Sequence, residues 1–88
     1  MYEIRFSKLA EKHKKFLKQA GIDGKARKLL AVLMEDPFKN PPPYEALVGD
    51  LKGYYSRRIN IQHRLVYQVY EKEKEVKVLS MWTHYQDM

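Results

Sequence analysis

The chain has 88 residues, 44% of them hydrophobic and 12% aromatic, with no cysteine and a formal net charge of +6. This length and composition predict one folded domain over residues 1–88 and argue against disorder throughout, while the lack of cysteine excludes disulfides and thiolate–metal sites. The basic excess favours binding to a polyanion or to an acidic protein, although charge that merely keeps a protein soluble would look the same.

The N-terminal stretch predicts a short strand followed by a basic amphipathic helix. Residues 2–6 alternate in polarity as a strand does, and no apolar segment typical of a signal peptide accompanies them. Ser7 is suited to cap a helix that runs to about Ala20, where Gly21 ends it. The helix has a lysine-rich face, and its apolar stripe is expected to contain Leu9, Phe16, Leu17 and Ala20.

A second helix and a long loop complete this half of the chain. Asp23 is expected to cap the helix, whose apolar residues repeat at helical spacing. The helix must end before Asp36, because Pro37 disfavours helical geometry in the residue before it. Residues 38–50 form a long irregular segment that is stiffened by three prolines, and loops of this length in a compact domain are often functional.

Three strands are expected in the C-terminal half. They cover residues 54–61, 64–70 and 76–82, and the short turns between them predict an antiparallel meander. With the N-terminal strand and helices, the order is β-α-α-β-β-β. The sequence therefore predicts an α+β fold in which an antiparallel sheet carries the two helices on one face.

Arginines on the first two of these strands indicate an anion site. Alternation places Arg57 and Arg58 on opposite faces, and a hairpin centred on Ile61 would set Arg58 directly opposite Arg64. Two like charges that face each other destabilise a sheet unless an anion lies between them, and guanidinium groups suit phosphate. Two solvated arginines that turn away from each other would give the same pattern.

Two further residues could supply acid–base chemistry. His84 precedes Tyr85 at the end of the last strand, and histidine exchanges protons near neutral pH. Glu45 lies in the proline-stiffened loop, where a carboxylate could act as a general base. Ordinary exposed side chains would also fit both places. His13 among the helical lysines and His63 in a turn are expected to be ordinary exposed histidines, and the three histidines are too scattered to predict a metal site.

These residues fall in three motifs, which read GYYSRRI at 53–59, HRLVY at 63–67 and HY at 84–85. Upstream, PYEAL at 43–47 is similar to a Pro-Glu-x-Leu stretch with one residue inserted before the glutamate. Together the motifs resemble the YoeB/Txe branch of the RelE-like superfamily of bacterial toxins from toxin–antitoxin pairs. The resemblance covers about half of the chain, and SRRI followed by HRLVY is its most specific part.

The resemblance implies a RelE-like fold and a ribosome-dependent mRNA endonuclease that uses no metal or other cofactor. In such a site Glu45 takes the proton from a ribose 2′-OH, which attacks the adjacent 3′-phosphate. Arg64, helped by Arg58, holds the extra negative charge of the transition state, and His84 protonates the leaving 5′-oxygen. Tyr85 stacks on a base or positions the phosphate. The implied products carry 2′,3′-cyclic phosphate and 5′-hydroxyl ends.

The chain departs from the family pattern at two places. Val48 stands where the family commonly has a lysine, three residues after the glutamate, and Lys52 is a candidate to replace that lysine in RNA binding. Residues 86–88, Gln-Asp-Met, follow the His-Tyr pair at which the family tends to end, so a terminal carboxylate is displaced from the site. Two non-catalytic alternatives stay open: a module that binds RNA or ribosomes, and a protein that binds only its antitoxin, as a transcriptional co-repressor.

The expected partners are the ribosome with its mRNA and an acidic, partly disordered antitoxin of the YefM/Phd type, which would fold over the basic helices and cleft. A homodimer is also compatible with the resemblance. No apolar run approaches the roughly 18–20 residues of a membrane-spanning helix. A cytoplasmic protein without membrane association is therefore expected.

Overall fold

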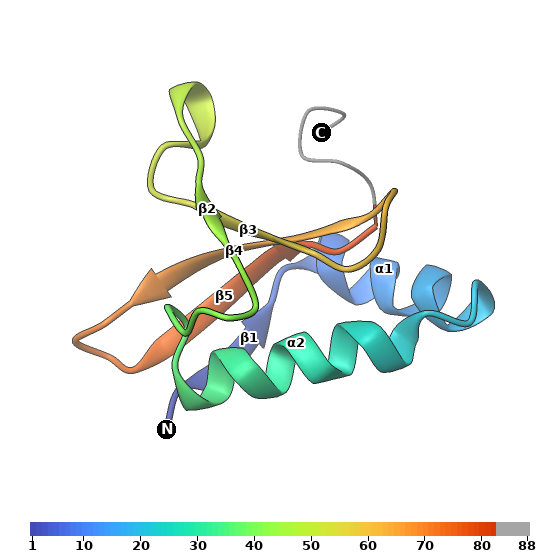
Figure 1. Ribbon diagram of the computed structural model, residues 1–88, viewed down its shortest axis with the longest axis horizontal. Helices are drawn as coiled ribbons and strands as arrows, with labels where there is room; N and C mark the ends of the chain where they lie inside the picture. Colours follow the sequence, from blue (N-terminus) through green and yellow to red (C-terminus); the bar gives the residue numbers. More distant parts are fainter. Residues whose placement is uncertain (83–88) are drawn as a thin grey trace.

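The computed structural model describes residues 1–82, which contain two α-helices on one side of a five-stranded sheet (Figure 1). This is the predicted α+β order with one short strand added. No helix in this range is long and apolar enough to cross a membrane. In chain order the elements are β1 (Glu3–Phe6), α1 (Lys8–Gln19), α2 (Asp23–Glu35), β2 (Glu45–Ala46), the 3-10 helix η1 (Gly49–Leu51), β3 (Tyr55–Arg58), β4 (Arg64–Tyr70) and β5 (Glu75–Ser80).

The strand order across the sheet is β1-β5-β4-β3-β2. The pairs β3–β4 and β4–β5 are antiparallel, which confirms the predicted meander. The edge strand β1 instead runs parallel to β5, with Ile4 beside Val76, so the sheet is not wholly antiparallel as expected. Alternation shows which face of a strand is apolar, but it carries no information about the direction of the neighbouring strand.

The two helices begin in different ways. Ser7 caps α1 as predicted: its hydroxyl oxygen accepts a hydrogen bond from the Ala10 N–H at 3.0 Å, and the hydroxyl donates to a β5 carbonyl at 2.7 Å. The prediction that Asp23 caps α2 is wrong, because Ile22 occupies the N-cap position and Asp23 is the first helical residue. The Asp23 carboxylate accepts a hydrogen bond from Arg27 at 2.7 Å and interacts favourably with the positive end of the helix dipole.

The buried stripe of α1 also differs from the predicted one. It contains Ala10, His13 and Leu17, whereas Leu9 and Ala20 are exposed. The observed spacing of three and four residues is that of a single helix face. Because histidine is counted as a polar residue, the sequence pattern did not show that His13 belongs to the face of α1 that is buried.

Two of the predicted strands are shorter than expected. β3 ends at Arg58 rather than at residue 61, because the Asn60 side-chain oxygen accepts hydrogen bonds from two backbone N–H groups of the turn, at 2.9 and 2.7 Å. Ile61 therefore lies in the turn and is 93% exposed. β5 ends at Ser80 rather than at residue 82.

A β-bulge in β5 decides which side chains share the face away from the helices. Tyr67 pairs with Val78, but the adjacent Val66 pairs with Ser80, so Leu79 is an extra residue in β5. The bulge thereby sets Ser80 beside Val66. The opposite face packs on the helices, and its core cluster includes Leu17, Leu33, Leu65, Tyr67, Val76, Val78 and Met81.

Candidate active site

Three charged side chains of the predicted site come together on the face of the sheet away from the helices. Arg58 at the end of β3 pairs with Arg64 at the start of β4, which confirms the predicted register. An Nη1–H of Arg64 donates to the Ser56 hydroxyl oxygen at 3.1 Å, and the same nitrogen lies 3.6 Å from a carboxylate oxygen of Glu45. A pocket of about 390 Å³ is lined by Pro43, Tyr44, Glu45, Ser56, Arg58 and Arg64.

Glu45 lies in the two-residue strand β2, where an irregular loop was expected. Glu45 pairs with Ser56, Ser56 with Val66, and Val66 with Ser80, so one row of residues crosses four strands. Strand pairing therefore holds the carboxylate at the edge of the pocket more firmly than an unpaired loop would. A strand of two residues is too short to show alternation, which explains why the sequence did not predict it.

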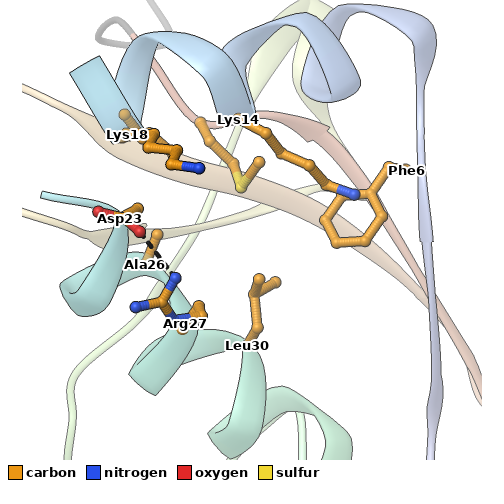
Figure 2. A pocket seen from close by; sticks show the side chains of 9 residues that line it. Phe6, Lys14, Lys18, Asp23, Ala26, Arg27 and Leu30 are labelled. Carbon is orange, nitrogen blue, oxygen red and sulfur yellow. Dashed lines mark hydrogen bonds and ion pairs between the residues drawn. The ribbon is translucent and has the colours of Figure 1, made fainter. Parts of the chain in front are cut away.

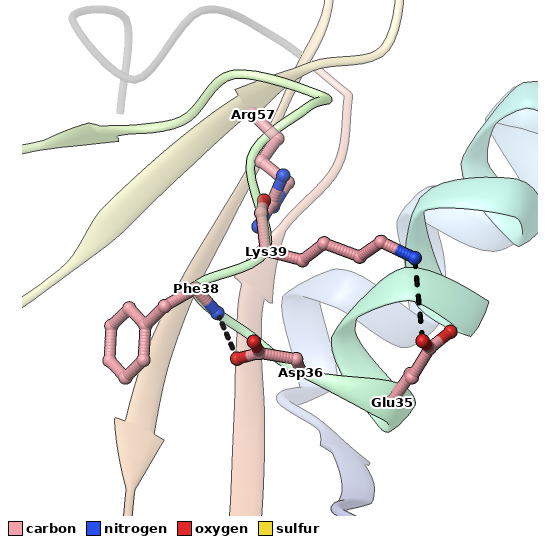
Figure 3. Close-up of polar contacts among 5 residues, drawn as sticks. All are labelled: Glu35, Asp36, Phe38, Lys39 and Arg57. Atoms are coloured by element: carbon pink, nitrogen blue, oxygen red, sulfur yellow. Dashed lines mark hydrogen bonds and ion pairs between the residues drawn. The ribbon is translucent and has the colours of Figure 1, made fainter.

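The segment before β2 is held by Arg57, for which no structural role was predicted. Its fully buried guanidinium donates hydrogen bonds to the carbonyls of Pro37 at 3.0 Å, Lys39 at 2.8 Å and Pro42, and it points at this backbone in Figure 3. Its Nε–H donates to the Tyr67 hydroxyl at 3.2 Å, which in turn donates to the Pro37 carbonyl at 2.9 Å. Burial raises the pKa of Tyr67 to about 12, so the hydroxyl keeps its proton at neutral pH. Arg57 thus satisfies carbonyls that irregular backbone would otherwise leave unpaired.

Short contacts fix the start of the same segment. α2 ends at Glu35, before Asp36, as predicted. The Asp36 carboxylate accepts a hydrogen bond from the Phe38 N–H at 2.9 Å, and Lys39 forms an ion pair with Glu35 at 3.3 Å (Figure 3). The Phe38 ring then packs edge-on against Tyr55, with 5.2 Å between ring centroids. The chain therefore approaches β2 along a defined path.

The other predicted site residues are not part of this pocket or lie outside the described range. Lys52 is exposed at the C-terminal end of η1 and is not among the pocket residues in the part of the chain described. Val48 is 85% exposed. His84 and Tyr85 lie outside the described residues, as does the Gln-Asp-Met tail at 86–88.

Two histidines that were expected to be exposed are buried. His13 is 6% exposed and His63 is 4% exposed. Burial lowers the pKa of both imidazoles, and Lys12 and His63 lower that of His13 further. Both rings are therefore neutral at pH 7. Within residues 1–82 no group of three potential metal-binding side chains is assembled.

The pocket combines a carboxylate with two guanidinium groups. A carboxylate at its edge can accept a proton, and guanidinium forks bind phosphate oxygens in pairs. This arrangement suits a substrate that carries a hydroxyl group beside a phosphate. RNA has such a hydroxyl at each ribose, and DNA does not.

Residues 7–85 match a family model described as the YoeB-like toxin of bacterial type II toxin–antitoxin system. Toxin YoeB of Synechocystis sp. is 37% identical over 73 residues, which is 83% of this chain and 76% of the relative. Toxin YoeB of Streptomyces coelicolor is 54% identical over 41 residues, 47% of this chain and 49% of the relative.

Solved structures agree with the family match. The YoeB/ParE toxin from Agrobacterium tumefaciens superposes with a TM-score of 0.85 at 28% identity, covering 94% of this chain and 99% of that one. The YoeB–YefM complex from Staphylococcus aureus gives a TM-score of 0.80 at 34% identity, covering 97% and 99%.

Proposed function

Because this chain belongs to the YoeB-like toxins of bacterial type II toxin–antitoxin systems, we propose that it is an endonuclease that cuts mRNA on the ribosome and needs no metal ion or other cofactor. The observation that supports this most is the convergence of Glu45, Arg58 and Arg64 on one pocket. A base beside two phosphate-binding cations is what cleavage by a ribose hydroxyl requires.

In the proposed reaction the ribose 2′-oxygen attacks the adjacent phosphorus. Glu45 takes the proton from the 2′-OH as the new oxygen–phosphorus bond forms, and His84 gives a proton to the 5′-oxygen as the old bond breaks. Arg64 and Arg58 hold the extra negative charge on the phosphoryl oxygens. Because the Ser56 hydroxyl accepts a hydrogen bond from Arg64, the guanidinium is oriented before substrate arrives. The products are a 2′,3′-cyclic phosphate and a 5′-hydroxyl.

The ribosome supplies what this small open site lacks. Free RNA is flexible, and attack needs the 2′-oxygen, the phosphorus and the leaving oxygen in line. A ribosome that presents the message in a bent, fixed path would provide that alignment, with Lys52 on the phosphate backbone and Tyr85 stacked on a base. We further assign residues 1–88 to one toxin domain that acts in the cytoplasm, where translating ribosomes are found.

A toeprint of a translated mRNA tests this function. Purified protein should cut the message when ribosomes translate it and should leave the same naked RNA intact at matched concentration. Dialysis of the protein against EDTA before it is added to magnesium-containing ribosomes should not change the rate. Glu45→Gln is the control for contaminating nuclease. Efficient cleavage of naked RNA, unchanged by ribosomes, would contradict ribosome dependence.

A non-catalytic role is a second candidate, and the exposed Val48 is the observation that favours it. A lysine at this position would add a cation to the RNA-binding surface, so its absence favours binding without efficient cleavage. Growth after induction distinguishes the two functions. A nuclease arrests growth and Glu45→Gln relieves the arrest, whereas a binding module gives the same growth with or without this substitution.

We also propose an acidic antitoxin as the partner, since a relative from Staphylococcus aureus was solved as a YoeB–YefM complex. A groove of about 360 Å³ between α1 and α2 fits such a partner (Figure 2). Leu17, Ala26 and Leu30 contribute apolar surface to the groove. Its cationic residues are Lys14, Lys18 and Arg27, and Arg27 is paired with Asp23, which also lines the groove. Acidic residues around apolar anchors would complement both features. A homodimer is proposed on the same grounds, because a YoeB dimer from that species has also been solved.

A further inference from the structure

The two residues after β5 are held by side chains from distant parts of the chain. The backbone N–H of Met81 donates a hydrogen bond to Nδ1 of His13 on α1, at 3.0 Å. The Trp82 ring stacks on His63 with 4.0 Å between centroids and an interplanar angle of 18°. Phe16, also on α1, contacts the same indole, with centroids 5.4 Å apart. We call these side chains, His13, Phe16 and His63, the exit clamp.

Both histidines are themselves fixed in place. His13 accepts at Nδ1, so its proton must be on Nε2, and the ring is in its neutral form. The backbone of His63 is tied down by its N–H to Asn60 Oδ1 at 2.7 Å and by its carbonyl, which accepts from the Ile59 N–H at 2.9 Å. Within the described residues, His63 Nδ1 has no hydrogen-bond partner although it is buried. Among the described residues, the contact that this ring makes with the exit is therefore its stack on Trp82 and not a hydrogen bond through Nδ1.

We infer that His13 and His63 are positioning residues that fix Met81 and Trp82, the residues from which the chain continues to the proposed general acid, His84. This rests on the proposed function, which gives His84 its role. Two residues of chain span at most about 7 Å, so the position of Trp82 limits where His84 can reach. A shift of about 1 Å in a reacting group can cost on the order of 100-fold in rate. Among residues 1–82, the groups that act electrostatically on His13 are Lys12, from α1 itself, and His63, from the β3–β4 turn.

Substitution of His13 separates positioning from packing. His13→Leu fills similar space but removes the acceptor for Met81, whereas His13→Asn can place an amide oxygen near the position of Nδ1. In single-turnover cleavage on programmed ribosomes, His13→Leu should lower the maximal rate about 10- to 100-fold, while the ribosome concentration that gives half of the maximal rate stays unchanged. His13→Asn should restore most of the lost rate. Leu9→Ala, on an exposed part of the same helix, is the matched control and should cleave as the wild type does.

Trp82 is the only tryptophan in the chain, so its fluorescence reports the clamp without any assay of cleavage. A protonated imidazole stacked on an indole quenches its emission. Emission of the folded protein should therefore fall as the pH decreases, with a midpoint below 6.5, because burial lowers the pKa of His63. His63→Phe should keep the stack and abolish the step.

The outcomes separate this inference from the proposed function. Wild-type cleavage by folded His13→Leu would overturn the positioning role, as would loss of folding in both His13→Leu and His13→Asn, which would make His13 a core residue only. A pH step that persists in His63→Phe would overturn the clamp. If the wild type did not cleave at all, the proposed function would fail, while the fluorescence experiment would still decide whether the clamp exists.

Discussion

Arg57 and Arg58 are adjacent in β3 and point to opposite faces of the sheet. Arg57 is fully buried and binds backbone carbonyls of the segment before β2, whereas Arg58 is exposed at the pocket opposite Arg64. One guanidinium therefore stabilises the fold while the next is available to a phosphate. Lysine could not replace either arginine, because an ammonium group lacks the planar guanidinium that makes several hydrogen bonds in a fixed geometry.

Arg64 is the side chain whose loss should most affect the chemical step. Arg64→Ala should raise the barrier by about 3–4 kcal/mol, the effect of removing a preorganised donor from a developing anion. Single-turnover rates on programmed ribosomes measure this. Arg5→Ala is the control, since Arg5 lies on the edge strand β1 in an exposed ion pair with Glu75. A fall of less than about threefold for Arg64→Ala would remove this residue from the proposed site.

Glu45 and His84 should act as a unit. Each single change, Glu45→Gln or His84→Ala, should lower the rate by about 10²- to 10⁴-fold, the range for positioned proton transfer. The double variant should lose far less than the product of the two effects, because both residues serve one transition state. Ribosome binding by all three variants should match the wild type, since many other cations contribute to it. Full activity in His84→Ala would contradict the assignment of the acid.

The buried histidines predict how stability depends on pH. The folded-state pKa values of His13 and His63 are lowered, so the unfolded chain binds protons first as the pH decreases. Their contribution to stability is therefore complete above pH 6.5 and is lost as the pH falls through the lowered values. Urea unfolding between about pH 6.5 and pH 5, above the range in which most carboxylates protonate, should show this decline. His13→Asn should flatten the decline, and an unchanged slope in that variant would show that His13 is not its source.

A buried hydrogen-bond network formed by Arg57 and Tyr67 helps to hold the segment before β2. Tyr67→Phe removes the donor to the Pro37 carbonyl and leaves the Arg57 Nε–H without its acceptor. The free energy of unfolding should fall by about 1–3 kcal/mol, the cost of a buried polar group left unpaired. Tyr70→Phe is the matched control, because the Tyr70 hydroxyl donates a hydrogen bond to Gln68 at the surface. This substitution should change the free energy of unfolding by no more than about 0.5 kcal/mol. Equal effects of the two substitutions, measured by urea unfolding, would contradict the role of the network.

Elements set by local chemistry could be predicted from the sequence. Ser7 was recognised as a cap because its hydroxyl and the helix that it begins are close in the chain. The pairing of Arg58 with Arg64 was predicted for the same reason, since a tight hairpin fixes the register of its two strands. The two arginines of the candidate site were therefore predictable from residues that are near one another in sequence.

The remaining features depend on contacts between distant segments. β2 exists only because Glu45 finds Ser56 across the sheet, and the parallel pairing of β1 with β5 joins opposite ends of the chain. His13 is buried because Met81 supplies a backbone donor 68 residues away. The hydrophobic pattern of a sequence carries no information about partners that are distant in the chain. A buried histidine or arginine is therefore predicted to be exposed.

The net charge of +6 predicts the behaviour of the protein as a whole towards its antitoxin. Association with an acidic partner is accelerated by long-range attraction, which salt screens over a Debye length of about 8 Å at physiological ionic strength. The association rate should therefore fall steeply as salt increases, while the dissociation rate changes less. Stopped-flow mixing measures both rates. Lys14→Ala with Lys18→Ala should reduce the salt dependence if the groove is the contact surface, and an association rate insensitive to salt would contradict an electrostatic encounter.

The chemistry of the fragment ends tests the proposed reaction most directly. mRNA cut on ribosomes by the purified protein, with Glu45→Gln as the nuclease-contamination control, is analysed by mass spectrometry. Attack by the 2′-oxygen predicts a 2′,3′-cyclic phosphate on the upstream fragment and a 5′-hydroxyl on the downstream one, because the ribose hydroxyl and not water forms the new bond to phosphorus. A 5′-phosphate on the downstream fragment would mean that water attacked, and it would contradict the roles assigned to Glu45 and His84.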